Sequence, residues 1–150
     1  GLNEIEILNL RTAALFHDSG FLIKYDDNEE IGVKIFNQYA PKFGFDSNDL
    51  KIISVIILAT NNKVEPKTLS EKIMCDADHD YLGRQDYHHV AQKLNKELAI
   101  YKNKLSSDNW VNLQIEYLEK KHKYYTTSAF NLRQQGKEKR IAELKRYFNT

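Results

Sequence analysis

A histidine and an aspartate lie next to each other where an apolar run of the chain ends. The run covers residues 12–16, His17 and Asp18 follow it directly, and Gly20 comes two residues later. An imidazole nitrogen and a carboxylate oxygen are both ligands for divalent metal ions. Neighbouring residues on a helix diverge by about 100°, so the two side chains converge on one ion only where the helix ends, and a glycine favours that ending. A histidine that only complements the helix dipole is the alternative.

A second acidic group follows much later in the chain. Asp76, Asp78 and Asp80 alternate with other residues, as the first ligands of a calcium-binding EF-hand loop do. That loop requires a glycine at its sixth position and a glutamate at its twelfth. Tyr81 and Tyr87 occupy these positions here, which excludes the EF-hand interpretation. On a helix, Asp76 and Asp80 would share one face and Asp78 would point elsewhere.

Together the two stretches resemble the HD superfamily of metal-dependent phosphohydrolases. In that family a histidine, a His-Asp doublet and a distant aspartate, all on helices, surround one or two metal ions. The resemblance implies that His17, Asp18 and Asp76 bind a divalent ion such as Mn²⁺, Mg²⁺ or Fe²⁺, and that Asp18 takes part in catalysis. It assigns Asp78 and Asp80 to neighbouring backbone or helix ends. It also implies an all-α, single-domain helical bundle of the HD type over residues 1–150.

Four further residues are candidates for binding the substrate. Lys24 and Arg84 lie close in sequence to the two ligand stretches and could bind a substrate phosphate. Asn28 and Thr60 stand where members of the family often carry histidines. An amide oxygen is a weak ligand for a transition metal, and a threonine hydroxyl would at most bind a substrate or a water through a hydrogen bond.

The resemblance predicts hydrolysis of a nucleotide or another phosphate ester by a metal-activated water. No residue of this chain matches the first metal-binding histidine of the family, which lies upstream of the doublet. We therefore expect a domain that is incomplete at its N-terminus or that has lost this ligand. The alternative is a catalytically degraded HD-fold module that binds a ligand or regulates, because Asn28 and Thr60 also replace family histidines. Whether the protein is an enzyme stays open at this point.

The composition narrows the class of protein. There are 22 Lys and Arg residues against 21 Asp and Glu residues, and the net charge of +1 argues against bulk attraction to nucleic acid or to an anionic membrane. Cys75 is the only cysteine, which excludes an intrachain disulfide and fits a cytoplasmic protein. The longest apolar stretch, residues 52–59, is far shorter than the roughly 20 residues of a membrane span.

The partner expected from these observations is a small phosphorylated molecule, for example a nucleotide. A homodimer stays open as well, because an incomplete start could leave an apolar groove that a second copy fills.

Apolar periodicity predicts helices in the first half of the chain. One covers residues 3–16, and another begins with a capping box at Asp27 and Glu30. The β-branched content of residues 50–59 favours a strand on propensity alone. No other segment offers a strand partner, however, and the polar residues before it favour a central buried helix. The buried face of the first helix is expected at Ile5, Leu8, Thr12 and Leu15.

The second half is also expected to be helical. The run from Thr68 to Glu71 is a capping box that begins the helix carrying Asp76. Another helix follows Asp86 and ends before a turn at residues 105–108. Beyond that turn we expect a long helix over residues 110–130, capped by Asp108, then a break at Gly136 and a last helix carrying Ile141, Leu144 and Phe148.

The remaining four histidines have no metal-binding role in this prediction. His88 and His89 cannot both face one ion from a straight helix, so at least one lies at the surface or at the edge of the core. We expect His79 to be exposed. His122 precedes an aromatic pair and is interpreted as structural or as part of a pocket rim.

Overall fold

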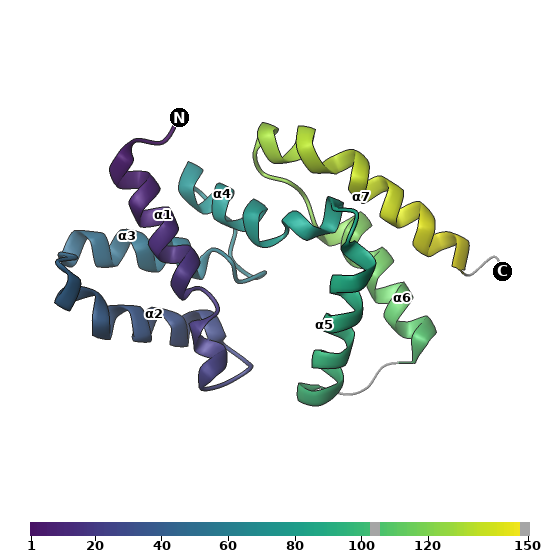
Figure 1. Cartoon of the computed structure of the whole chain (residues 1–150), viewed down its shortest axis with the longest axis horizontal. Helices are drawn as coiled ribbons and strands as arrows, with labels where there is room; N and C mark the ends of the chain where they lie inside the picture. The colour runs from purple at the N-terminus through teal and green to yellow at the C-terminus, as the bar shows by residue number, and fades with distance from the viewer. Residues whose placement is uncertain (103–105, 148–150) are drawn as a thin grey trace. The chain divides into compact units, whose positions relative to one another are not determined.

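The computed structural model describes residues 1–102 and 106–147. Within these ranges the chain is all-helical and contains no strand, as the sequence predicted (Figure 1). The chain divides into two compact units, Gly1–Asp78 and His79–Thr150. Each unit has its own hydrophobic core, and the two are described separately. The expected single domain of the HD type stays a prediction.

Side-chain caps set the helix starts in the first unit. Asn3 accepts from the backbone N–H of Glu6, whose carboxylate binds back to the N–H of Asn3. Asp46 and Asp49 form the same reciprocal cap before the central apolar helix, which confirms that this segment is helical despite its β-branched content. The helices and turns of this unit are α1 (Glu4–Phe16), η1 (Ser19–Leu22), α2 (Asn28–Tyr39), η2 (Ala40–Phe43), α3 (Ser47–Leu58) and α4 (Leu69–Asp78).

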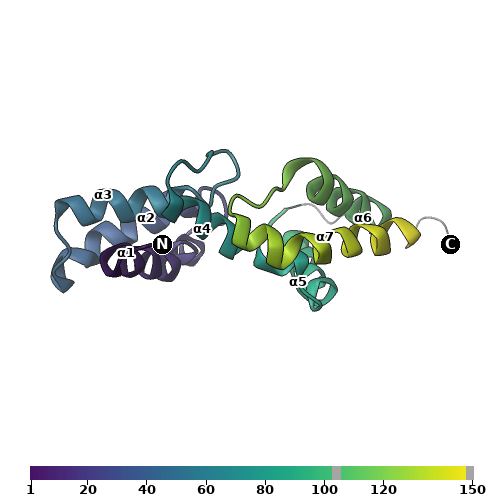
Figure 2. The same cartoon turned by 90° about the horizontal axis from the view of Figure 1, so that it is seen from above.

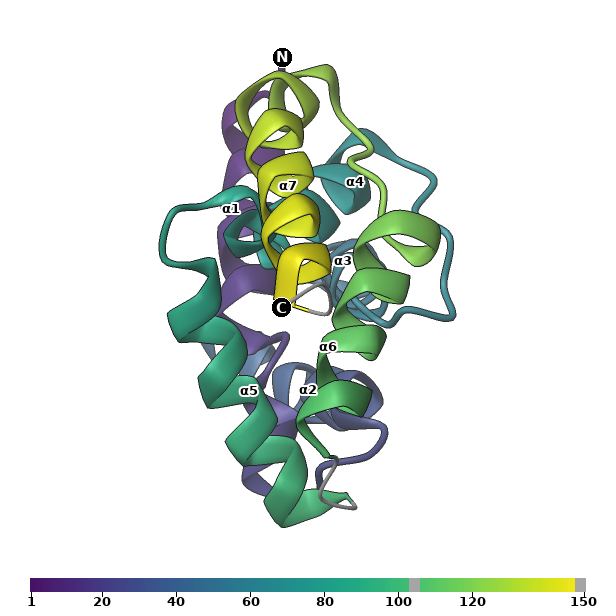
Figure 3. The same ribbon diagram turned by 90° about the vertical axis from the view of Figure 1, so that its right-hand side faces the viewer.

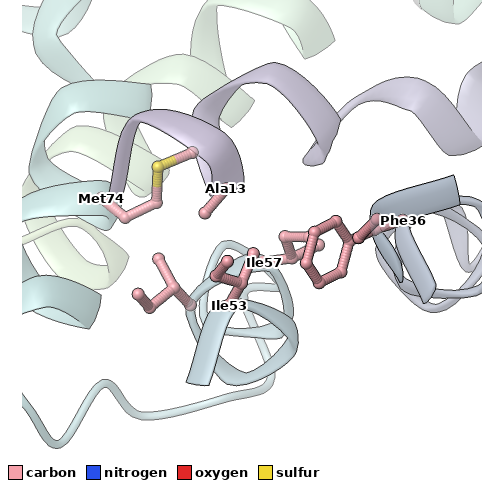
Figure 4. Close-up of a cluster of buried hydrophobic side chains, with 7 residues drawn as sticks. Ala13, Phe36, Ile53, Ile57 and Met74 are labelled. Carbon is pink, nitrogen blue, oxygen red and sulfur yellow. The ribbon is translucent and has the colours of Figure 1, made fainter. Parts of the chain in front are cut away.

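The core of the first unit is centred on α3, which lies against α1, α2 and α4 (Figure 2). Ile53 and Ile57 of α3 have no exposed surface and face Phe36 of α2, Ala13 of α1 and Met74 of α4 (Figure 4). Full burial of an aliphatic or aromatic side chain stabilises a fold by about 1.5–3 kcal/mol. The prediction that α3 is the central helix is confirmed, but only one face of it is buried, because Ile52 and Val55 are 42% and 49% exposed.

The buried face of α1 differs from the expected one. Ile5, Leu8 and Leu15 are 66%, 54% and 80% exposed, and among the four predicted positions only Thr12 is buried. The residues of α1 that lie in the core are Asn9, Thr12 and Ala13. Small and polar residues suit this face because α3 and α4 both pack against α1. The predicted positions Ile5, Leu8 and Leu15 are left on the outside, whereas Leu10 and Phe16 pack partly buried against the core.

Asp27 begins α2 without the predicted capping box. Its backbone is left-handed, with φ of 58°, and its side chain makes no capping hydrogen bond at the start of α2. The Asp27 carboxylate instead accepts from the Lys24 ammonium at 2.8 Å. The position of the helix start was correct, but the reason given for it was wrong. At Thr68 the prediction holds better, because the hydroxyl accepts from the N–H of Glu71 at 3.3 Å and donates to its carboxylate at 2.8 Å.

The described residues of the second unit form five helical segments. Its core combines Leu82, Tyr87, Trp110, Leu118 and Leu144 with smaller side chains. The Tyr87 hydroxyl is buried but donates to the Gln114 side chain at 2.8 Å. The segments are η3 (Asp80–Gly83), α5 (Tyr87–Tyr101), α6 (Ser107–Glu116), the π-helical turn η4 (Tyr117–Lys121) and α7 (Thr127–Tyr147).

The last two helices of the second unit were predicted with wrong bounds. The expected helix over residues 110–130 stops at η4, and Ser106 caps it instead of Asp108. Gly136 does not break a helix, because α7 runs through it without interruption (Figure 3). A Cβ at Gly136 would lie 1.9 Å from the carbonyl oxygen of Gly83, so this glycine permits close packing of α7 against η3. Of the residues named in the sequence prediction, Leu105 and Phe148 lie outside the described ranges.

No helix of the described residues combines the length and the apolar content that a bilayer span requires.

Candidate functional site

His17 lies at the C-terminal end of α1, where the sequence placed it. Its backbone N–H closes the helix by donating to the Ala13 carbonyl at 2.9 Å. In the ring, Nδ1 lies 3.0 Å from the Ala14 carbonyl oxygen. A carbonyl can only accept, so Nδ1 carries a proton and donates it. This contact fixes the orientation of the ring and directs Nε2 away from the helix.

Two carboxylates face Nε2 of His17. Asp18 Oδ2 lies 3.2 Å away and Asp78 Oδ1 lies 3.5 Å away. The hydrogen bond to Asp18, followed by the one to Asp78, raises the pKa of His17 from 6.5 to about 10. Without a metal ion, the imidazole is therefore a cation at neutral pH, shared between two anions. The His17 side chain is 19% exposed, so this pair lies near the surface but is partly shielded from water.

Asp78 was not expected in this cluster. It is the last residue of α4, and that helix is positioned by Met74, which packs in the core with Ala13 of α1. Residues two apart on a helix point about 200° apart, so Asp76 and Asp78 project differently. Asp76 is buried, and Asp78 is the one that pairs with His17. Asp78 was expected to hold neighbouring backbone or a helix end, and its ion pair with His17 is a contact that this expectation did not include.

Two glycines bring α2 against the His17 turn. A Cβ at Gly20 would lie 1.8 Å from the Asn28 carbonyl oxygen, and one at Gly32 would lie 2.8 Å from the Phe16 carbonyl oxygen. Any larger residue at either place would push the two backbones apart. Ser19 adds a hydrogen bond of 2.6 Å to the Phe16 carbonyl. Gly20, which the sequence indicated as a helix end, therefore also permits close packing of α2.

Two of the candidate substrate residues, Lys24 and Thr60, have structural partners of their own. The exposed Lys24 ammonium pairs with Asp27, which raises the pKa of Lys24. The buried Thr60 hydroxyl donates to the Ile57 carbonyl at 2.8 Å at the end of α3. Asn28 is buried at the start of α2. Their roles in binding a substrate stay predictions.

Arg84 belongs to the second unit, where it binds two acids. Its Nε donates to Asp86 Oδ1 at 2.8 Å, and Nη2 contacts the other oxygen of the same carboxylate. Nη1 lies 3.7 Å from Asp80. Asp80 also accepts a hydrogen bond from Arg133, whose Nε lies 2.5 Å from Asp80 Oδ1. The expected role of Asp80 at a backbone or helix end is therefore replaced by an ion-pair network. The substrate role predicted for Arg84 stays a prediction.

The donor set of the first unit has the chemistry of a divalent-ion site. Imidazole and carboxylate groups suit Mn²⁺ and Fe²⁺, and a metal-bound histidine commonly donates its other N–H to a backbone carbonyl, as His17 does. In the part of the chain that the structure describes, however, no three His, Cys, Asp or Glu side chains are arranged to hold a metal ion. His17, Asp18 and Asp76 therefore do not form a closed centre as they stand. The bound metal stays a prediction.

A second polar cluster, not anticipated from the sequence, lies within the second unit. The Tyr117 hydroxyl is 2.8 Å from His79 Nε2, so His79 is half-buried instead of exposed. Lys137 donates to the carbonyl oxygen of His122 at 3.1 Å and lies 3.3 Å from its Nδ1. Burial, followed by the nearby Lys137 charge, lowers the pKa of His122 to about 3. A neutral His122 can then accept from the ammonium.

This second cluster holds the segment between η4 and α7 in place. Lys137 is itself buried, which lowers its pKa, and its ammonium lies 5.5 Å from the centre of the Tyr124 ring. The structural interpretation of His122 agrees with these contacts. Lys137 carried no signal in the sequence, since a lysine within a run of charged residues usually lies on a solvated face.

Comparisons of the chain with family models, with curated proteins and with solved structures find no match.

Proposed function

We propose that the chain is a phosphate-ester hydrolase of the HD type and that its catalytic centre is built on His17, Asp18, Asp76 and Asp78. The observation that supports the proposal best is the direction of His17 Nε2, which faces two carboxylate oxygens at 3.2 and 3.5 Å. Its Nδ1 is held by the Ala14 carbonyl. Three carboxylates would more than balance the charge of a dication, and these ligands together with one neutral imidazole would leave positions open for water and substrate.

In this proposal a divalent ion lowers the pKa of a bound water and neutralises charge on a phosphoryl oxygen. The protein residues would hold this ion and orient the groups that bind it. The Ala14 carbonyl selects the tautomer of His17 in which Nε2 is the ligand. The proton that Nε2 shares with Asp18 and Asp78 must leave when a cation binds, so metal affinity is expected to rise with pH.

The experiment measures metal content and turnover together. The purified chain is dialysed against Mn²⁺, Mg²⁺ or Fe²⁺, analysed for bound metal and assayed on a generic phosphate ester and on nucleotides. The variants Asp76→Asn and His17→Gln are expected to lose both metal and activity. Asp108→Asn changes an exposed carboxylate of α6 and serves as the matched control. Absence of bound metal and of turnover with all three ions would reject the proposal.

A second candidate is a ligand-binding or regulatory module without catalysis. Two observations favour it: the His17 imidazolium already compensates Asp18 and Asp78, and no three His, Cys, Asp or Glu side chains of the described residues are arranged to hold a metal ion. This candidate predicts that the melting temperature responds to a nucleotide but not to a divalent ion. Asp76→Ala would then leave nucleotide binding intact, whereas in a hydrolase it would abolish metal binding.

A further inference from the structure

One side of α1 carries an exposed stripe of alternating charged and apolar residues. Glu4, Leu8, Arg11 and Leu15 follow one another at intervals of four, three and four residues, and all four are exposed. On an α-helix these positions fall within an arc of about 60°. Leu8 and Leu15 are 54% and 80% exposed. The stripe is therefore a narrow apolar surface with a negative charge near its start and a positive charge beyond its middle.

The stripe continues into other apolar surface of the same unit. Ile5, next to Leu8 on α1, lines a groove of about 490 Å³ together with Ile52 and Val55 of α3. Ile52 and Val55 are 42% and 49% exposed. Contiguous apolar surface of this kind marks an interaction site more often than isolated exposed residues do.

The order of the charges selects one kind of partner. Glu4 and Arg11 are separated by about 10 Å along the helix axis, at a rise of about 1.5 Å per residue. If a second α1 lies antiparallel with its midpoint opposite residues 7 and 8, Glu4 of each copy stands beside Arg11 of the other. Ile7 of each copy then lies opposite Leu8 of the other, one such pair on each side of the two-fold axis. A parallel arrangement would instead set Glu4 against Glu4 and Arg11 against Arg11.

We infer that the exposed face of α1 is a self-association surface on which a second copy of this chain docks, with the two α1 helices antiparallel about a two-fold axis. A two-fold interface needs a surface that complements itself. The stripe meets this condition in charge and in apolar content. Leu8 and Ile7 form the centre of the contact, and two Glu4–Arg11 pairs, one on each side, set its register.

Sedimentation of the whole chain over a range of protein concentrations tests the inference. A monomer–dimer equilibrium is expected. Leu8→Asp places a carboxylate at the centre of the contact and should weaken the dimer by at least about tenfold. Ile100→Asp is the matched control, because Ile100 is 75% exposed on α5; it should leave the equilibrium unchanged.

Charge reversal supplies the sharper measurement, since exposed charges can be changed without disturbing the core. Glu4→Arg and Arg11→Glu should each weaken the dimer several-fold, and the double variant should restore it. The single effects should shrink at high salt. Far-UV circular dichroism checks that each variant is folded. A chain that stays monomeric at every concentration, or a dimer that Leu8→Asp and both reversals leave unchanged, overturns the inference.

Discussion

The protonated His17 should make the metal-free protein less stable as the pH rises. Its pKa is raised from 6.5 to about 10, first by the hydrogen bond to Asp18 and then by that to Asp78. Between these pH values the folded chain keeps a proton that the unfolded chain has released. The stability contributed by this proton is therefore complete below about pH 6.5 and is lost as the pH rises through about 10.

The size of the effect follows from the exposure of the partners. Each unit of difference in pKa corresponds to about 1.4 kcal/mol, so the upper bound for this proton is about 5 kcal/mol. The Asp18 side chain is 60% exposed and that of Asp78 is 30% exposed. Solvent screens such contacts strongly, and we expect about 1–2 kcal/mol. Asp78→Asn should remove only part of it.

Urea unfolding in the presence of a chelator measures this contribution. Wild type should be more stable than His17→Gln at a pH of about 6, and the difference should shrink by about 1–2 kcal/mol at a pH near 10. His88→Gln is the control, because His88 also pairs with a carboxylate, that of Glu143 at 2.8 Å. The free energy of unfolding of His88→Gln should differ from that of wild type by no more than about 0.5 kcal/mol at either pH. An equal difference between wild type and His17→Gln at both pH values would refute the reasoning.

Three further predictions concern packing. Ile57→Ala, at a position without exposed surface, should lower the unfolding free energy in urea by about 2–5 kcal/mol, whereas Val55→Ala, at a position that is 49% exposed, should cost less than about 1 kcal/mol; equal losses would contradict the assignment of the core. Gly136→Ala should lower the melting temperature although alanine favours helices, because its Cβ would lie 1.9 Å from a carbonyl oxygen of η3. Gln135→Ala on the same helix should be neutral or stabilising, and a stabilised Gly136→Ala would disprove the close contact. The Cys75 thiol, whose pKa burial raises to about 12, should resist alkylation in mildly alkaline buffer until the protein is unfolded, as followed by mass spectrometry; rapid alkylation of the folded chain would show that the thiol is accessible.

Helix positions could be predicted where the signal is local. The cap at Asp46 and Asp49 identified α3 as a helix although its β-branched residues favoured a strand, because the cap lies within the segment that it starts. Asp27 shows the limit of such signals. A similar pattern, an acid followed by a second acid three residues later, is present at Asp27 and Glu30, but Lys24 binds the Asp27 carboxylate instead. Two local interactions competed, and composition does not show which is stronger.

Faces and contacts between distant residues could not be predicted in the same way. Apolar spacing on α1 indicated a buried row, but close packing with α3 and α4 favours the smaller Ala13 and Thr12. At Gly136, local propensity predicted a break, whereas the helix continues because it packs against Gly83. In the candidate site, His17 and Asp18 could be predicted because they are neighbours in the sequence. Asp78 joins them only through the direction in which α4 ends.

The wide turn η4 has a consequence for the length of the chain. A π-helical turn contains one residue more than an α-helical turn of the same span. Deleting the exposed Lys120 or Lys121 would let a regular turn close, and the side chains on either side would change their relative direction by about 100°. Tyr117 and His122 would then no longer both reach His79, whose ring each contacts. In this stretch the count of residues matters more than their types. Chimeric chains should therefore be joined outside it.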